Sequence, residues 1–299
     1  MTRCLLTILT VVLLCACRDS RPELAEQNAV YYWRTELRLD STERAFLTQH
    51  HIKKVYCRYF DVVMGDDGEP VPNATITFVD TLPADVELVP TVYITEDCMH
   101  QPHPGLAEKI VKRIQQMNET NDISGVSELQ IDCDYTARSR QTYYDFLKEI
   151  TSQLSILRSA RRDACQSKNY QLSTTIRLHQ LAMAPPPADY GVLMLYNTGD
   201  PMNFVERNPI LDQRDVQPYL RYLNDYALPL AAAYPVYQWV RHISGVRVEH
   251  TVEAGELLQV KQAVERERPE LRRTIVTYHL DKENIKRYKP VTYEEIYRH

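Results

Sequence analysis

Short apolar runs alternate with amphipathic segments along most of the chain. The runs have the length and the β-branched and aromatic content of strands, and they predict strands over 29–35, 54–63, 87–95, 128–135, 171–180, 191–197, 228–239 and 273–280. Apolar residues recur at helical spacing between them, over 41–50, 105–117, 140–157, 215–226 and 255–267. This alternation is typical of a parallel α/β architecture. Eight such strands in one domain predict a (β/α)8 TIM-type barrel.

Two connections depart from the regular alternation. Residues 65–70 read Gly-Asp-Asp-Gly-Glu-Pro and precede an apolar run over 74–79, which predicts a turn and an inserted hairpin after the second strand. Three consecutive prolines at 185–187 exclude a helix interior there. We therefore expect the fifth and sixth strands to be joined by a loop or a very short helix.

The first residues have the pattern of a bacterial export signal. Arg3 supplies positive charge, residues 5–14 are apolar, and Leu14-Cys15-Ala16-Cys17 resembles a lipobox, with cleavage before Cys17 and lipidation of its thiol. A plain secretory signal or a short membrane anchor is the alternative, although the apolar run is short for a bilayer span. The pattern predicts a signal peptide over 1–16, a lipidated tether over 17–28 and one barrel domain over 29–299.

Charge and composition narrow the partners and the compartment. A formal net charge of −5 without a basic stripe argues against a nucleic-acid partner. The chain has 20 Tyr against 5 Phe, and tyrosine suits carbohydrate surfaces as well as ordinary packing. Residue 18 is Arg and not the Asp that resembles an inner-membrane retention signal. This favours the outer membrane of a bacterial envelope. The sequence does not show whether the protein faces the periplasm or the outside, or what its oligomeric state is.

Four cysteines besides Cys17 fall in the predicted barrel, with no metal-like spacing. In an oxidising envelope they allow up to two disulfides in three connectivities, and buried free thiols are the alternative. These residues are Cys57, Cys98, Cys133 and Cys165. No constellation in the sequence requires a metal or a cofactor, although Asp132 and Asp134 would suit a hard cation if other oxygens joined them.

The candidate chemistry gathers where the predicted strands end. In 128–135, Gln130, Asp132 and Asp134 share one face, and two carboxylates there are costly unless they line a polar cavity. Active sites of such barrels lie at this end. We predict Asp132 and Asp134 as the catalytic pair. Saccharide-binding candidates at the other strand ends are Trp33, Arg34, Arg58, Arg177, His179, Tyr196, Asn197, Trp239, Tyr278 and His279.

An arginine facing the same lumen would satisfy the charge of Asp132. Arg58 and Arg177 are the two candidates, because each lies near the end of a predicted strand. A purely structural ion pair inside the barrel is the alternative to a catalytic role. Packing is likewise the alternative for each aromatic candidate.

Two short motifs resemble those of family 18 glycoside hydrolases. Ile131-Asp132-Cys133-Asp134-Tyr135-Thr136 is similar to the family's aspartate-x-aspartate-aromatic-glutamate motif, and Met194-Leu195-Tyr196-Asn197 is similar to its methionine-x-tyrosine-aspartate motif. The resemblance implies that Asp134 orients the acetamido group of a substrate and that Asp132 supports it. It implies sugar contacts for Tyr196 and Asn197. The lipobox with this motif also resembles bacterial envelope lipoproteins.

The general-acid position of that family falls on Thr136. A threonine hydroxyl cannot serve as the proton donor, since its pKa is far from the required range. Either another acid has the role, with Asp134, Glu96, Asp97 and Asp200 as candidates, or the chain binds glycans without cleaving them. Three hypotheses stay open: a membrane-anchored glycosidase, a tethered saccharide-binding protein, and a scaffold lipoprotein.

Overall fold

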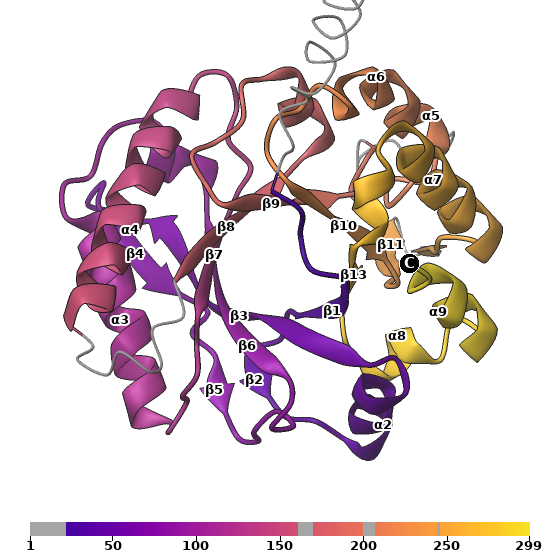
Figure 1. The fold of residues 1–299 in the computed structure, drawn as a ribbon, viewed down its shortest axis with the longest axis horizontal. Helices are drawn as coiled ribbons and strands as arrows, with labels where there is room; N and C mark the ends of the chain where they lie inside the picture. The colour runs from indigo at the N-terminus through magenta and orange to yellow at the C-terminus, as the bar shows by residue number, and fades with distance from the viewer. Residues whose placement is uncertain (1–21, 161–169, 200–206, 244–245) are drawn as a thin grey trace, which may run out of the picture.

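Eight parallel strands close into a barrel in the computed structural model, which describes residues 22–160, 170–199, 207–243 and 246–299. Each strand pairs with the next, and the last pairs with the first, which confirms the predicted (β/α)8 fold (Figure 1). In barrel order the strands are β1 (Gln27–Tyr32), β3 (Ile52–Met64), β6 (Glu87–Ile94), β7 (Glu128–Cys133), β8 (Gln171–Ile176), β9 (Tyr190–Met194), β10 (Leu230–Pro235) and β13 (Thr274–Tyr278).

Helices surround the strands. The longer ones are α2 (Ser41–Gln49), α3 (Leu106–Thr120), α4 (Arg140–Ala160) and α7 (Ala254–Glu267). Shorter pieces are η1 (Glu96–Met99), η2 (Leu178–Ala182), α5 (Gln213–Val216), η3 (Gln217–Tyr219), α6 (Leu220–Leu223), η4 (Pro269–Arg272), α8 (Lys282–Ile285) and α9 (Pro290–Ile296). The single helix predicted over 215–226 is therefore wrong, because Pro218 lacks the N–H that a continuous helix needs.

The inserted hairpin after the second barrel strand is confirmed. β3 continues to Met64 and pairs antiparallel with β4 (Pro70–Asn73) across a turn in which Gly68 has a φ of +78°. β5 (Thr77–Phe78) then pairs with β2 (Glu36–Leu37). No α-helix lies between β3 and β6, so short strands replace the usual helix in this connection, as the turn residues predict. The connection from β8 to β9 holds only η2, in agreement with the three prolines.

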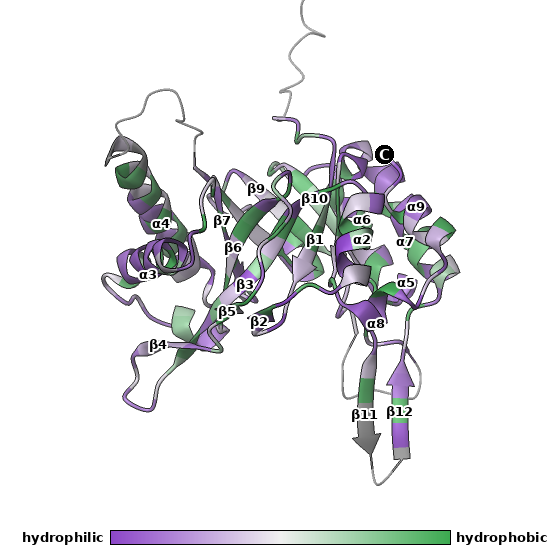
Figure 2. Cartoon of the chain, turned by 90° about the horizontal axis from the view of Figure 1, so that it is seen from below, coloured by the Kyte–Doolittle hydropathy of each residue, from purple (hydrophilic) through white to green (hydrophobic). Residues whose placement is uncertain are grey.

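A second hairpin differs from the prediction. The strand expected over 228–239 ends at Pro235, and Trp239 instead begins β11 (Trp239–Ile243), which pairs with β12 (Val246–His250). Proline cannot donate to a strand ladder, which explains why β10 ends there. Figure 2 shows the β11–β12 hairpin projecting beyond the barrel on the same side as β4. Trp239 is therefore on an extension of the carboxyl face.

The barrel interior is polar along one strand. Glu128 and Gln130 of β7 point inward, where Lys54 of β3 lies 2.6 Å from Glu128 and the Tyr31 hydroxyl donates to Gln130 at 2.9 Å. Ser173 and Tyr190 also donate to Glu128. A buried charge needs such partners, so side chains from several strands converge on β7.

The segment before β1 is fixed at the amino end of the barrel. Arg273 donates to the carbonyl of Leu24 at 2.7 Å and lies 3.2 Å from the carboxylate of Glu23, and Thr274 donates to the carbonyl of Ala25. Both partners lie at the start of β13. The chain thus enters the barrel at the end opposite to the predicted site.

Three of the four barrel cysteines are free thiols. Cys57, Cys98 and Cys133 are fully buried, and burial raises the pKa of the Cys57 thiol. The disulfide expectation is therefore wrong for these three, while Cys165, Cys17 and the predicted signal at 1–16 lie outside the described residues. Within the described ranges no helix is long and apolar enough to cross a membrane.

We predict that Lys54→Met destabilises the fold by about 3–5 kcal/mol, because it leaves Glu128 charged and buried without its cation. The side chains of Lys54 and Glu128 are only 7% and 1% exposed. Urea denaturation at neutral pH measures the loss. Lys53→Met is the matched control, since Lys53 pairs with Asp85 in solvent and should cost less than about 1 kcal/mol. Equal effects of the two changes would contradict the interpretation.

Candidate functional site

A cavity of about 340 Å³ opens at the carboxyl ends of β7, β8 and β9. Five predicted site residues line it, namely Asp134, Arg177, His179, Tyr196 and Asn197. Leu178, Met194, Thr198 and Tyr219 complete the wall. The size is at the lower end of the range for small-molecule pockets, about 300–1,000 Å³. It is the strongest candidate for a binding site at this face of the barrel.

One guanidinium connects the two predicted catalytic carboxylates. Arg177 donates from Nε to Asp134, and its Nη2 lies 3.4 Å from Oδ1 of Asp132. The Thr175 hydroxyl also donates to Asp132 at 2.6 Å. Asp132 is sealed, with its side chain 3% exposed, whereas that of Asp134 is 46% exposed. Only Asp134 is therefore accessible to a ligand in the cavity.

Burial changes the protonation of the deeper acid. Loss of solvent raises the pKa of Asp132 to about 6, and the opposing charge of Arg177 offsets only part of this effect. A raised carboxylate pKa is a property of many catalytic acids. Here the carboxyl group is enclosed and accepts hydrogen bonds from Arg177 and Thr175, so it is not placed to give a proton to a ligand in the cavity.

Tyr196 lines the cavity and has a buried hydroxyl without a partner among the described residues. The residue is 3% exposed. Its ring stacks on Tyr278 with centroids 4.6 Å apart. Tyr278 therefore supports the cavity wall from behind and does not line it. A buried, unpaired hydroxyl is costly, and a ligand in the cavity would satisfy it.

Aromatic rings continue from Tyr278 in two directions. Trp33 lies 5.7 Å from Tyr278 on one side, while Tyr237 on the other side lies 5.4 Å from Tyr278 and 6.4 Å from Trp239. The Tyr237 hydroxyl donates to Asn197 at 2.5 Å, which ties this row of rings to the cavity. Trp33 and Trp239 are thus at the margins of the site and not in its lining.

Arg58 does not contact Asp132. Its guanidinium pairs with Asp61 of the same strand at 2.7 Å and lies over the ring of Trp33 at 5.7 Å. The prediction that Arg58 neutralises Asp132 is therefore wrong, and Arg177 has that role alone. Asp61 is only three residues from Arg58 on β3, whose register is irregular after Arg58. It is therefore a closer partner for Arg58 than Asp132 across the barrel.

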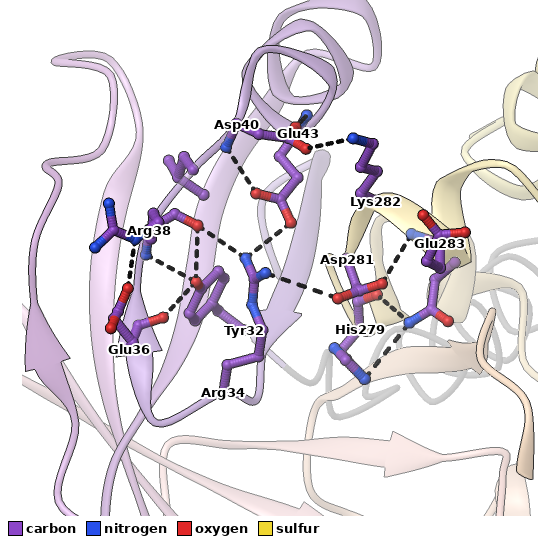
Figure 3. Close-up of polar contacts among 12 residues, drawn as sticks. Tyr32, Arg34, Glu36, Arg38, Asp40, Glu43, His279, Asp281, Lys282 and Glu283 are labelled. Carbon is purple, nitrogen blue, oxygen red and sulfur yellow. Dashed lines mark hydrogen bonds and ion pairs between the residues drawn. The ribbon is translucent and has the colours of Figure 1, made fainter. Parts of the chain in front are cut away.

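Arg34 and His279 belong to a separate polar network (Figure 3). Arg34 donates to Glu43 at 2.8 Å, lies 3.7 Å from Asp281 and covers the ring of Tyr32. Asn284 donates to the carbonyl of His279 at 3.1 Å, and burial lowers the pKa of the His279 ring. This network joins the loops after β1 and β13. Neither residue lines the cavity, and their predicted sugar contacts stay predictions.

The position of the family's acid is occupied by a hydrogen-bonded cluster. The Thr136 and Ser139 hydroxyls donate to Oε1 of Glu96 at 2.9 and 2.6 Å, and the His100 ring lies 2.7 Å from Oε2. These hydrogen bonds, that of Ser139 first, lower the pKa of Glu96. Glu96 is therefore ionised at neutral pH and is a poor proton donor.

Of the remaining acid candidates in the described part of the chain, Asp134 lines the cavity, and its role as the acid stays a prediction. Asp97 accepts from the Thr95 hydroxyl at 2.5 Å and does not line the cavity. Asp200 lies outside the described residues. In the described part of the chain, no three His, Cys, Asp or Glu side chains gather as a metal ion would need.

Some cavity residues carried no sequence signal. Tyr219 comes from a segment predicted as an ordinary helix, and Thr198 follows a motif that ended at Asn197. The strand expected over 171–180 also ends early, at Ile176, because the Gln180 side chain accepts from the Arg177 N–H at 2.8 Å and starts η2. His179 therefore reaches the cavity from η2 and not from the strand face.

Solved structures that align with this chain include chitinases and a spore cortex-lytic enzyme. A GH18 chitinase from Cycas revoluta in complex with (GlcNAc)3 aligns with a TM-score of 0.55 at 10% identity, over 91% of this chain and 98% of that one. The spore cortex-lytic enzyme SleL of Bacillus cereus aligns with a TM-score of 0.53 at 14% identity, over 92% and 74%. This chain shares their fold. Identities this low show the fold alone, and no family model or curated protein matches the sequence.

We predict that Asp132→Asn removes a pH dependence of stability. Because the pKa of Asp132 is raised on folding, its stabilising contribution is full below about pH 4 and is lost as the pH rises through about 6. Relative to wild type, the variant should gain about 3 kcal/mol of unfolding free energy between about pH 4 and about pH 7. Denaturant titrations across this range measure it. Asp66→Asn, on an exposed turn, should keep the wild-type profile, and a parallel profile for Asp132→Asn would contradict the assignment.

Proposed function

We propose that this protein binds an N-acetylated saccharide in the carboxyl-face cavity. Tyr196 carries the proposal, because the residue lines the cavity beside Arg177 and Asp134 and its buried hydroxyl is unpaired among the described residues. A hydroxyl donor, a half-exposed carboxylate and the amide of Asn197 together match the donors and acceptors of a sugar. The aligned chitinase structure holds (GlcNAc)3, which supports the choice of ligand class.

Binding without hydrolysis is the activity that this geometry favours. The acid position is Thr136, the nearby Glu96 is held ionised, and Asp132 is enclosed. Hydrolysis is the second candidate, and the specific observation in its favour is the raised pKa of Asp132 beside a second carboxylate. The resemblance of the two sequence motifs supports both candidates equally.

The location follows from the sequence pattern. We propose a bacterial envelope lipoprotein, anchored through Cys17 and most simply placed at the outer membrane. Metabolic labelling with a radioactive fatty acid, compared between wild type and Cys17→Ser, tests the anchor. Labelling that persists in the variant would exclude it.

We predict that wild type binds chitotriose and that Tyr196→Phe weakens this binding about tenfold, through loss of a buried hydrogen bond. Isothermal titration calorimetry measures both affinities. Tyr234→Phe is the matched control: Tyr234 is fully buried and its hydroxyl is also unpaired among the described residues, yet it does not line the cavity. No binding by wild type, or equal losses in the two variants, would count against the site.

We further predict that Thr136→Glu gives the protein hydrolytic activity. The new carboxyl would lie beside ionised Glu96, whose charge raises its pKa toward that of a general acid. A general acid contributes about 10²- to 10⁴-fold to such reactions. A chromogenic chitotrioside reports product release. Thr136→Gln introduces a side chain with the shape of glutamate but no acidic proton, so this variant should stay as inactive as wild type. Hydrolysis by wild type that Asp132→Asn abolishes would instead establish the second candidate.

A further inference from the structure

A second cavity lies on the flank of the barrel. Its volume is about 240 Å³, and it forms where η1, the loop before α3 and the first half of α4 meet. None of its lining residues belongs to the carboxyl-face cavity. Its inner wall is apolar, with Met99, Leu106 and Phe146, and its outer part is polar. The proposed saccharide site makes no use of it.

One buried histidine faces this cavity without a partner. The side chain of His103 is only 6% exposed, and its Nε2 makes no hydrogen bond within the described residues. Its other nitrogen, Nδ1, lies 3.7 Å from a carboxylate oxygen of Glu69 in the β3–β4 turn. Figures 1 and 2 place that hairpin on the same flank as α3. The histidine is therefore held between a carboxylate on one side and the cavity on the other.

Glu69 faces Nδ1 of His103. With the ring proton on Nδ1, beside this carboxylate, Nε2 has a lone pair and can accept a hydrogen bond. A buried acceptor in an apolar wall is satisfied best by a neutral donor, because burying a charged group there is costly. A hydroxyl group meets this requirement.

The outer part of the cavity has the opposite preference. Asp145 and Glu149 lie one turn apart on α4 and are both exposed. Asp145 also contacts Lys148 at 2.8 Å and Gln141 at 3.0 Å, but no Lys or Arg lines the cavity itself. Two carboxylates at an exposed entrance attract a cation without a large desolvation cost.

We propose that the flank cavity binds a short amino alcohol or a group of that chemistry. The hydroxyl donates to Nε2 of His103 at the inner end, the methylene chain packs against Met99, Leu106 and Phe146, and the ammonium lies between Asp145 and Glu149 at the entrance. This site is independent of the proposed saccharide site.

A series of linear amino alcohols of increasing length tests the proposal on the full-length protein. Long-range ¹H–¹⁵N NMR of the histidine rings should show a saturable shift of His103 Nε2. The 1-alkylamine and 1-alkanol of matching length each retain one of the two polar contacts and should bind about tenfold more weakly. Equal affinities for the amino alcohol, the alkylamine and the alkanol would overturn the proposal. So would the absence of a saturable shift of His103 Nε2 with any of them, and neither result requires a variant.

Two variants locate the charge. Asp145→Asn combined with Glu149→Gln should weaken amino alcohol binding and leave alkanol binding unchanged. Glu119→Gln, which removes an exposed acid of α3 outside the cavity, is the matched control and should change neither. An unchanged amino alcohol affinity in the double variant would refute the role of the entrance carboxylates. Binding of chitotriose should be the same in all three proteins, so failure here and failure of the saccharide site are distinguishable.

Discussion

Charge compensation along the inner face of β7 is the constraint on which both the barrel and the site depend. This strand points Glu128, Gln130 and Asp132 into the interior in succession, and none of them is tolerated there without a partner. The partners come from different strands: Lys54 from β3, Tyr31 from β1 and Thr175 from β8. The polar side chains of β7 therefore have their partners only when the strands of the closed barrel come together.

Asp132 is the last of these three inward side chains, and the arginine that it shares with Asp134 determines the charge of the cavity. Arg177 is shared between two carboxylates, so its charge is already neutralised when a ligand arrives. The cavity offers hydrogen-bond donors and acceptors with little net positive potential. Such a surface suits neutral sugars better than anionic ones. The same shared arginine fixes the side chain of Asp134, so the one accessible carboxylate is oriented before binding.

Much of this architecture could be predicted from the sequence, because it follows from local patterns. Eight apolar runs of strand length mark the strands, and the turn residues at 65–70 mark the first hairpin. The inward column of β7 also follows from alternation alone. The pattern could not show which arginine reaches Asp132, since Arg58 and Arg177 differ only in the position of a competing acid, Asp61.

Other features depend on contacts between distant segments. Only three residues lie between β10 and the β11–β12 hairpin, so the apolar run extends the predicted seventh strand to Trp239. The hydrogen bonds of Glu96 with Thr136 and Ser139 link residues some 40 positions apart, and no local pattern predicts them. Likewise, the burial of three thiols depends on how the helices cover the strands.

The fixed segment at residues 23–25 gives the molecule a direction. Because Arg273 and Thr274 bind it at the amino end of the barrel, this segment lies at the end opposite to the cavity. The fixed segment and the β11–β12 hairpin are therefore at opposite ends of the molecule, so a long polymer that approaches the carboxyl face meets the hairpin before it reaches the barrel.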